Sequence, residues 1–269
     1  MRTPIILALF AMASPPALAR AQETDTEWLQ NCRSKRWSSD REQVCDVEVK
    51  TIPARSMLNV RPGQNGAVKI EAYNGRDIEI HARMQANADS RGEAQELMRE
   101  INIETSGPIT ASGRESGRRK NWHVSFYIFV PRNTNVDVIT QNGPISIKNV
   151  IGKMALSAQN GPISLDGVGG DVHARAENGP LHVRLTGTRW TGEGLDAETH
   201  NGPLALEIPE NYNAALETGT INGPVETDFP INVTLNGRRG WRHFTTTLGR
   251  GGPSVRAVTT NGPLSLRRP

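Results

Sequence analysis

Aromatic residues and cysteine are both scarce in this chain of 269 residues. Phe, Trp and Tyr supply only 5% of it, so a buried core must be aliphatic. The formal net charge of +3 is too small to indicate a nucleic-acid partner. Gly and Pro are plentiful instead, with 26 and 17 residues, which is typical of a chain of many short strands joined by turns.

Acidic residues are absent after Asp228, although basic residues continue to the end of the chain. The arginines of this stretch are Arg238, Arg239, Arg242, Arg250, Arg256, Arg267 and Arg268. We interpret them as a solvated cap. The alternative is contact with anionic surface polysaccharide or lipid headgroups.

Long hydrophobic runs are also missing, apart from a short one at the N-terminus. Arg2 is followed by the uncharged stretch Pro4–Ala13 and then by small residues, a pattern that predicts a signal peptide over residues 1–21. Cleavage after Ala21 fits best, and cleavage after Ala19 also fits. The run is too short to span a bilayer, and no cysteine lies at the cleavage point to carry a lipid. We expect an exported protein that is not transmembrane, in the periplasm, at the cell surface or outside the cell.

The two cysteines, Cys32 and Cys45, lie shortly after the predicted cleavage site. In an oxidising compartment two nearby cysteines usually form a disulfide. A metal site is the alternative, but no His or further Cys lies near them. A disulfide would hold together the N-terminal segment of residues 22–55, and within it the polar stretch Glu27–Val47, which has too little apolar content to hold itself together.

The strongest signal is an internal repeat of the tripeptide Asn-Gly-Pro. It begins at Asn142, Asn160, Asn178, Asn201, Asn222 and Asn261, with intervals of 18, 18, 23, 21 and 39 residues. The last interval is close to two units. When the units are aligned on the Asn, the positions six, four and two before it and three and five after it carry no charged residue in any unit.

This alternation predicts two strands in each unit, each with one buried face, flanking a corner at Asn-Gly-Pro. Gly accepts positive φ at a corner, and Pro fixes φ as the next strand begins. We interpret the asparagines as a stacked corner ladder. The sequence therefore predicts an all-β chain whose residues 131–269 form a parallel β-solenoid, similar to a β-helix, by stacking of units. A meander or sandwich of antiparallel hairpins is the alternative.

Residues 56–130 also read mainly as β-structure. Strands are predicted at residues 57–60, 67–72, 77–82, 101–105 and 123–130, and a short helix at residues 92–100. Asn65-Gly66 and Asn74-Gly75 are predicted to be turns between the first three strands. We expect this region to cap one end of the stack, with residues 240–244 doing the same near the other end.

Most of the chain resembles the bacterial putative adhesin family, a group of exported proteins with a domain of unknown function. The resemblance is carried by Phe126–Pro131, by Val136–Gly143 and by the later Thr-x-Asn-Gly-Pro-Leu units, and it covers most of residues 56–269. It implies an exported β-solenoid at the cell surface. It implies no catalytic or binding residues.

Residues able to perform chemistry are few and scattered. His173, His182 and His200 are predicted to point outward, with His200 near Glu177 and Arg175 near Glu198. We interpret them as cross-strand pairs on a solvated face. The outward carboxylates of the repeat are Asp137, Glu177, Asp196, Glu198, Glu217 and Glu226. A polysaccharide-active β-helix enzyme would need clustered carboxylates or calcium ligands, and these do not cluster in the sequence.

The sequence thus predicts a non-enzymatic structural or adhesion-like binding protein, without catalytic residues, metal or cofactor. The polysaccharide-active enzyme is the alternative. No ligand can be assigned, although cell-envelope or surface polysaccharide is the partner class that we expect.

Overall fold

The computed structural model describes residues 16–34, 41–115, 117–229 and 242–269, with side chains for residues 24–34, 41–115, 117–229 and 243–269. The apolar run of the predicted signal peptide and the start of the predicted cap at residues 240–244 lie outside these residues. Within them the chain forms two helices, α1 (Pro16–Ser34) and α2 (Arg91–Glu100), and twenty strands. The chain is therefore all-β, as the sequence predicts.

The strands form two sheets of ten, which we call sheet A and sheet B. In spatial order sheet A contains β1 (Glu42–Pro53), β4 (Asp77–Ala88), β7 (Asn121–Pro131), β3 (Val68–Tyr73), β9 (Ile145–Lys148), β11 (Ile163–Asp166), β13 (Leu181–Arg184), β15 (Leu204–Glu207), β20 (Leu264–Arg267) and β17 (Val225–Thr227). Sheet B contains β18 (Arg242–Leu248), β16 (Ala214–Asn222), β19 (Ser254–Asn261), β14 (Gly194–Asn201), β12 (Gly169–Asn178), β10 (Ile151–Asn160), β8 (Val136–Thr140), β2 (Leu58–Arg61), β6 (Ile109–Ser112) and β5 (Asn102–Glu104).

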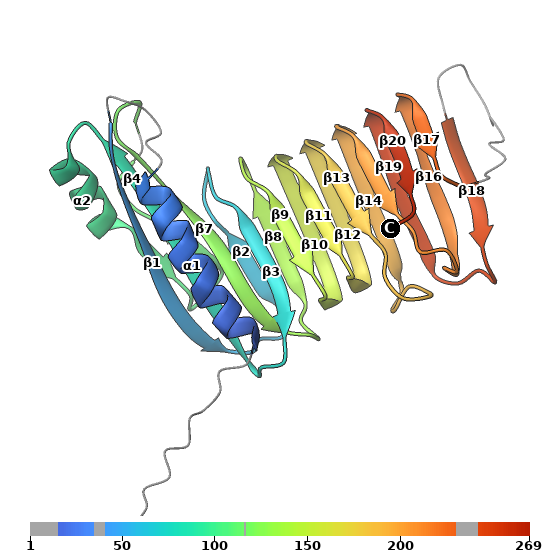
Figure 1. Cartoon of the computed structure of the whole chain (residues 1–269), viewed down its shortest axis with the longest axis horizontal. Coiled ribbons are helices and arrows are strands. Elements are labelled where there is room, and N and C mark those ends of the chain that lie inside the picture. Colours follow the sequence, from blue (N-terminus) through green and yellow to red (C-terminus); the bar gives the residue numbers. More distant parts are fainter. Residues whose placement is uncertain (1–15, 35–40, 116, 230–241) are drawn as a thin grey trace, which may run out of the picture.

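Each Asn-Gly-Pro corner joins a strand of sheet B to a strand of sheet A. Successive strands pair in parallel and in register, so that Met154 lies beside Val172 in sheet B and Ile163 beside Leu181 in sheet A. Figure 1 shows the strands side by side along the long axis of the molecule. Equivalent positions of successive units therefore lie next to one another.

The core lies between the two sheets and is aliphatic. Of the thirty uncharged positions that align in the sequence, all are buried except Val225 and Thr227 of the short edge strand β17. Four threonines in these rows bury their hydroxyls by donating to carbonyl oxygens of corner glycines: Thr140, Thr199, Thr220 and Thr259. A buried hydroxyl with such a partner avoids most of its desolvation cost.

The spatial order of the last units differs from their order in the chain. Strand β19 pairs in parallel with both β14 and β16, and β20 pairs with both β15 and β17. The unit at Asn261 therefore lies between the units at Asn201 and Asn222. This order arises because β18 pairs antiparallel with the outer side of β16, and the chain then returns to the inner side.

The first three strands are not joined by hairpins, which corrects the prediction for the two early Asn-Gly pairs. β2 pairs with β8 in sheet B and β3 pairs with β9 in sheet A, so Asn65-Gly66 is a corner between the sheets. β3 and β4 lie in one sheet, but β7 separates them. The Asn-Gly signal is the same for a corner and for a hairpin, and only the pairing of the strands distinguishes them.

Of the remaining N-terminal elements, β1, β4 and β7 extend sheet A, while β6 and β5 extend sheet B. β4 pairs antiparallel with β1 and β7, while α2 packs Ala94 and Leu97 against the end of β4. The helix begins as predicted, with the Ser90 hydroxyl accepting a hydrogen bond from the Glu93 amide. Strands β1 and β6 and helix α1 were not predicted. Helix α1 lies over the outer face of sheet A at this end (Figure 1).

Candidate functional site

The six asparagines of the repeat lie in one row along the corners, and Asn65 begins this row. Each side-chain amide donates to the Oδ1 atom of the preceding asparagine in space, over 2.8 to 3.2 Å. The spatial order is Asn65, Asn142, Asn160, Asn178, Asn201, Asn261 and Asn222. Each internal asparagine thus donates once and accepts once, which fixes the corners relative to one another.

The corner glycines do not have positive φ, which corrects the reason given for them from the sequence. They are required because the corners stack closely. A Cβ on Gly179 would lie 2.3 Å from the carbonyl oxygen of Gly161, and one on Gly161 would lie 2.4 Å from that of Gly143. The proline that follows does not interrupt the pairing, because its carbonyl oxygen accepts from the next unit: Ile163 N donates to Pro180 O over 3.0 Å.

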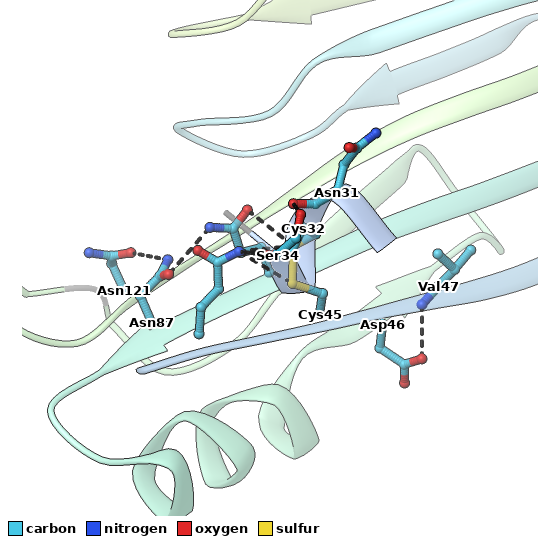
Figure 2. Close-up of a disulfide and its surroundings, with 10 residues drawn as sticks. Asn31, Cys32, Ser34, Cys45, Asp46, Val47, Asn87 and Asn121 are labelled. Atoms are coloured by element: carbon cyan, nitrogen blue, oxygen red, sulfur yellow. Dashed lines mark hydrogen bonds between the residues drawn. A yellow bond between two sulfur atoms is a disulfide. The ribbon is translucent and has the colours of Figure 1, made fainter. Parts of the chain in front are cut away.

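The predicted disulfide between Cys32 and Cys45 is present and joins the C-terminal end of α1 to β1, with a Cα–Cα distance of 6.3 Å. Figure 2 shows it beside a row of side-chain amides on the outer face of sheet A. Gln43 Nε2 also donates to the Cys32 carbonyl over 2.6 Å. The disulfide fits an exported protein, because such bonds persist in oxidising compartments.

Helix α1 is also held by a buried ionic network that the sequence did not reveal. His81 of β4 is only 1% exposed, and its two ring nitrogens face Asp25 of α1 and Glu79, the latter at 2.6 Å. Arg83 Nε donates to Asp25 over 2.7 Å. Burial lowers the pKa of His81, but the hydrogen bonds to Asp25 and Glu79 outweigh it and raise the pKa above its ordinary value.

On the outer face of sheet B, Arg256 of β19 lies at the centre of a row of charged side chains. Its guanidinium contacts Asp196 at 2.6 Å and Glu198 at 3.5 Å on β14, and Glu217 at 3.1 Å on β16. His243 of β18 contacts Glu217 on the other side, at 3.1 Å. We call these five residues the Arg256 row. The row borders a hollow of about 280 Å³.

In the Arg256 row one guanidinium lies among three carboxylates, so Arg256 balances only one of their three negative charges. Burial lowers the pKa of Arg256, but the hydrogen bond and charge of Asp196 and then those of Glu217 raise it overall. The side chains of Arg256 and Asp196 are each 33% exposed, so their pairing orders the surface more than it stabilises the fold. Among the described residues, no group of three or more His, Cys, Asp or Glu is placed to hold a metal ion.

Sequence reasoning named the three carboxylates as outward groups and Arg256 as part of a solvated cap, but it did not bring them together. Asp196, Glu198 and Glu217 were expected to be scattered because the units were read in chain order. The insertion of β19 between β14 and β16 brings Arg256 between them. No signal in the sequence marks this insertion except the 39-residue interval before Asn261.

The other predicted outward residues lie apart from the row or at its margin. His173 reaches Asp171 at 3.1 Å and Asp196 at 3.7 Å, while His182 pairs with Glu207 in sheet A at 2.9 Å. Arg175 is aligned with Glu198, as predicted. Arg175, Glu177, Glu198 and His200 border one shallow hollow. Asp137 pairs with Arg61 at 2.8 Å and Glu226 with Arg267 at 2.7 Å.

No helix of the described residues has the length and apolar character needed to cross a membrane. No protein-family model matches the chain. No curated protein matches it either.

Solved structures do show similarity. A putative cell adhesion protein from Clostridium sporogenes has 10% identity and a TM-score of 0.41, over 84% of this chain and 100% of that one. A putative adhesin from Bacteroides fragilis has 9% identity and a TM-score of 0.32, over 83% of this chain and 97% of that one. A putative lipid binding protein from Parabacteroides distasonis has 10% identity and a TM-score of 0.31, over 82% of this chain and 96% of that one.

Proposed function

We propose that this protein is an exported, non-enzymatic binding module of the adhesion type, built as a parallel β-solenoid. In this proposal residues 1–21 are removed on export and residues 22–55 form the segment held by the disulfide. Residues 56–130 close one end of the coils of residues 131–269. The in-register pairing of successive units, the row of asparagines at one corner and the disulfide support it.

The Arg256 row is the observation that most supports the proposed binding function. Its three carboxylates contact one shared guanidinium at the border of a hollow of about 280 Å³, so the same cation holds all three. A glycosidase needs one carboxyl group protonated and another free, with space for the sugar between them. Side chains held on a rigid sheet instead offer a fixed pattern of charges, which suits recognition of a polar partner.

Two experiments test this proposal. Fractionation of cells into periplasm, outer membrane and medium should find the protein outside the cytoplasm, without residues 1–21. Purified protein should bind charged cell-envelope polysaccharides more weakly as the ionic strength rises, because the contacts are charged. The same mixtures should yield no new reducing or unsaturated ends. Robust turnover of the polysaccharide would refute this proposal and favour a polysaccharide-active enzyme.

A further inference from the structure

A third hollow, of about 500 Å³, lies on the outer face of sheet A at the first corner of the stack. Its size is that of a small-ligand site. The side chains that can hydrogen-bond to a ligand there are Arg41, Asn65, Gln85, Asn87, Asn121 and His123. Figure 2 shows Asn87 and Asn121 of this set close to the disulfide that fixes the end of α1.

Three of these side chains are already ordered by one another. Gln85 Nε2 donates to Asn87 Oδ1 over 3.3 Å, and Asn87 Nδ2 donates to Asn121 Oδ1 over 3.0 Å. They come from the paired strands β4 and β7, where Asn87 is aligned with Asn121 and Gln85 with His123. These three amide side chains are therefore preorganised. The NH2 group of Asn121, the last of them, donates to no other residue within the described part of the chain.

The row of corner asparagines ends at the same hollow. Asn65 accepts from Asn142 over 3.2 Å, and its own amide donates to no described residue. His123 likewise makes no hydrogen bond to a described residue, and burial lowers its pKa, so it stays neutral with one donor and one acceptor. The hollow thus presents amide and imidazole groups from three separate segments of the chain.

The charge of the hollow is positive. Arg41 is its one charged lining residue, and no carboxylate borders it among the described residues. Asp89, an acidic side chain next in sequence to the end of β4, is paired with Arg119 at 2.7 Å. Arg41 forms no ion pair with a described residue. The absence of carboxylates excludes a divalent cation as the ligand, and the polar lining does not suit an acyl chain.

Arg41 can bind a carboxylate through its planar guanidinium. Side-chain amides and a neutral imidazole pair with hydroxyl groups, which both donate and accept. We propose that this hollow binds one carboxylate-bearing sugar residue of a polysaccharide, with its carboxylate on Arg41 and its hydroxyls on Asn65, Asn121 and His123. This site rests on the proposed binding function and assigns it a ligand class.

The test compares a trisaccharide of galacturonate with the galactose trisaccharide, by isothermal titration calorimetry on the full mature chain. Galacturonate should bind at least tenfold more tightly than the neutral sugar. Arg41→Gln and Asn121→Asp should each weaken binding at least tenfold, because one removes the cation and the other replaces an amide donor with a negative charge. The carboxylate that the second variant introduces can still accept the hydrogen bond from Asn87, so the fold should be retained, with unchanged thermal unfolding.

The matched control is Arg76→Gln. Arg76 is exposed and precedes β4 at the end opposite Asn87, about 36 Å away at the usual rise of a strand. This control should bind like the wild type. The site is refuted if galacturonate binds no better than the neutral sugar, or if Arg41→Gln and Asn121→Asp bind like the control. Salt-sensitive binding of whole polysaccharide that survives both variants would refute this site alone, whereas no binding of any polysaccharide would also refute the proposed function.

Discussion

Replacement of a corner glycine by alanine should lower the stability of the stack far more than the backbone conformation of that glycine would lead one to expect. At Gly179 φ is not positive, so alanine is compatible with the local backbone, but its Cβ would lie 2.3 Å from the carbonyl oxygen of Gly161. Ordinary contact needs at least 3.4 Å, so the two corners must move apart. That movement loosens the hydrogen bonds from Gly179 N to Asn201 O, at 3.0 Å, and from Gly161 N to Asn178 O, at 3.1 Å.

The expected loss of unfolding free energy is the sum of these effects. Forcing a methyl group into a packed contact costs about 1–3 kcal/mol, and each weakened hydrogen bond adds about 1 kcal/mol. We therefore expect Gly179→Ala to lower the unfolding free energy by about 3–5 kcal/mol. Urea denaturation followed by circular dichroism measures it.

Two other glycines separate the possible causes. Gly187 has φ of +75° and nothing within 4 Å of its added Cβ, so Gly187→Ala carries only backbone strain, about 1–2 kcal/mol. Gly107 has neither feature, and Gly107→Ala should change the unfolding free energy by less than about 1 kcal/mol. If Gly179→Ala were no more destabilising than Gly187→Ala, the close stacking of corners would not be what requires glycine.

The remaining predictions concern the core, helix α1 and the disulfide. Leu165→Asp should lower the melting temperature sharply, because Leu165 is fully buried. Its neighbour Ser164 is partly exposed, so the Ser164→Asp variant should melt like the wild type. Similar melting temperatures for the two variants would disprove the assigned faces. The raised pKa of His81 means that its contribution to stability is present below its ordinary value near 6.5 and is lost as pH rises through the folded value. The amides of α1 should therefore become less protected from hydrogen exchange as the pH rises, after correction for the intrinsic pH dependence of exchange. This loss of protection should occur in the wild type and not in the His81→Gln variant. The pKa of Asp25 is raised by burial but lowered overall by His81 and Arg83, so its contribution is lost at acid pH. Reduction of the disulfide should increase exchange in α1 while the repeat stays protected, and uniform exchange throughout the chain would contradict this.

Much of the fold could be predicted from the sequence because a strand repeats its environment every second residue. The alternation around Asn-Gly-Pro defined positions that are buried in the structure, apart from Val225 and Thr227 of the edge strand β17, and the helix at Ala94 and Leu97 followed from its spacing. Helix α1 escaped prediction because it is held by polar contacts, chiefly of Asp25 with His81 and Arg83, which leave no apolar stripe. The candidate site was only half predictable: its carboxylates were named, but their shared partner Arg256 was assigned to a solvated cap.

The sequence by itself determined the β-content, the corners, the buried rows and the cysteine pair, since these depend on local patterns and on short separations along the chain. Tertiary structure alone decided which units are neighbours. It placed Asn65 at the head of the asparagine row and inserted β19 between β14 and β16. The physical reason is that parallel units share the same edge chemistry, so any unit can pair with any other, and only the connections and the packing of the whole chain select the order.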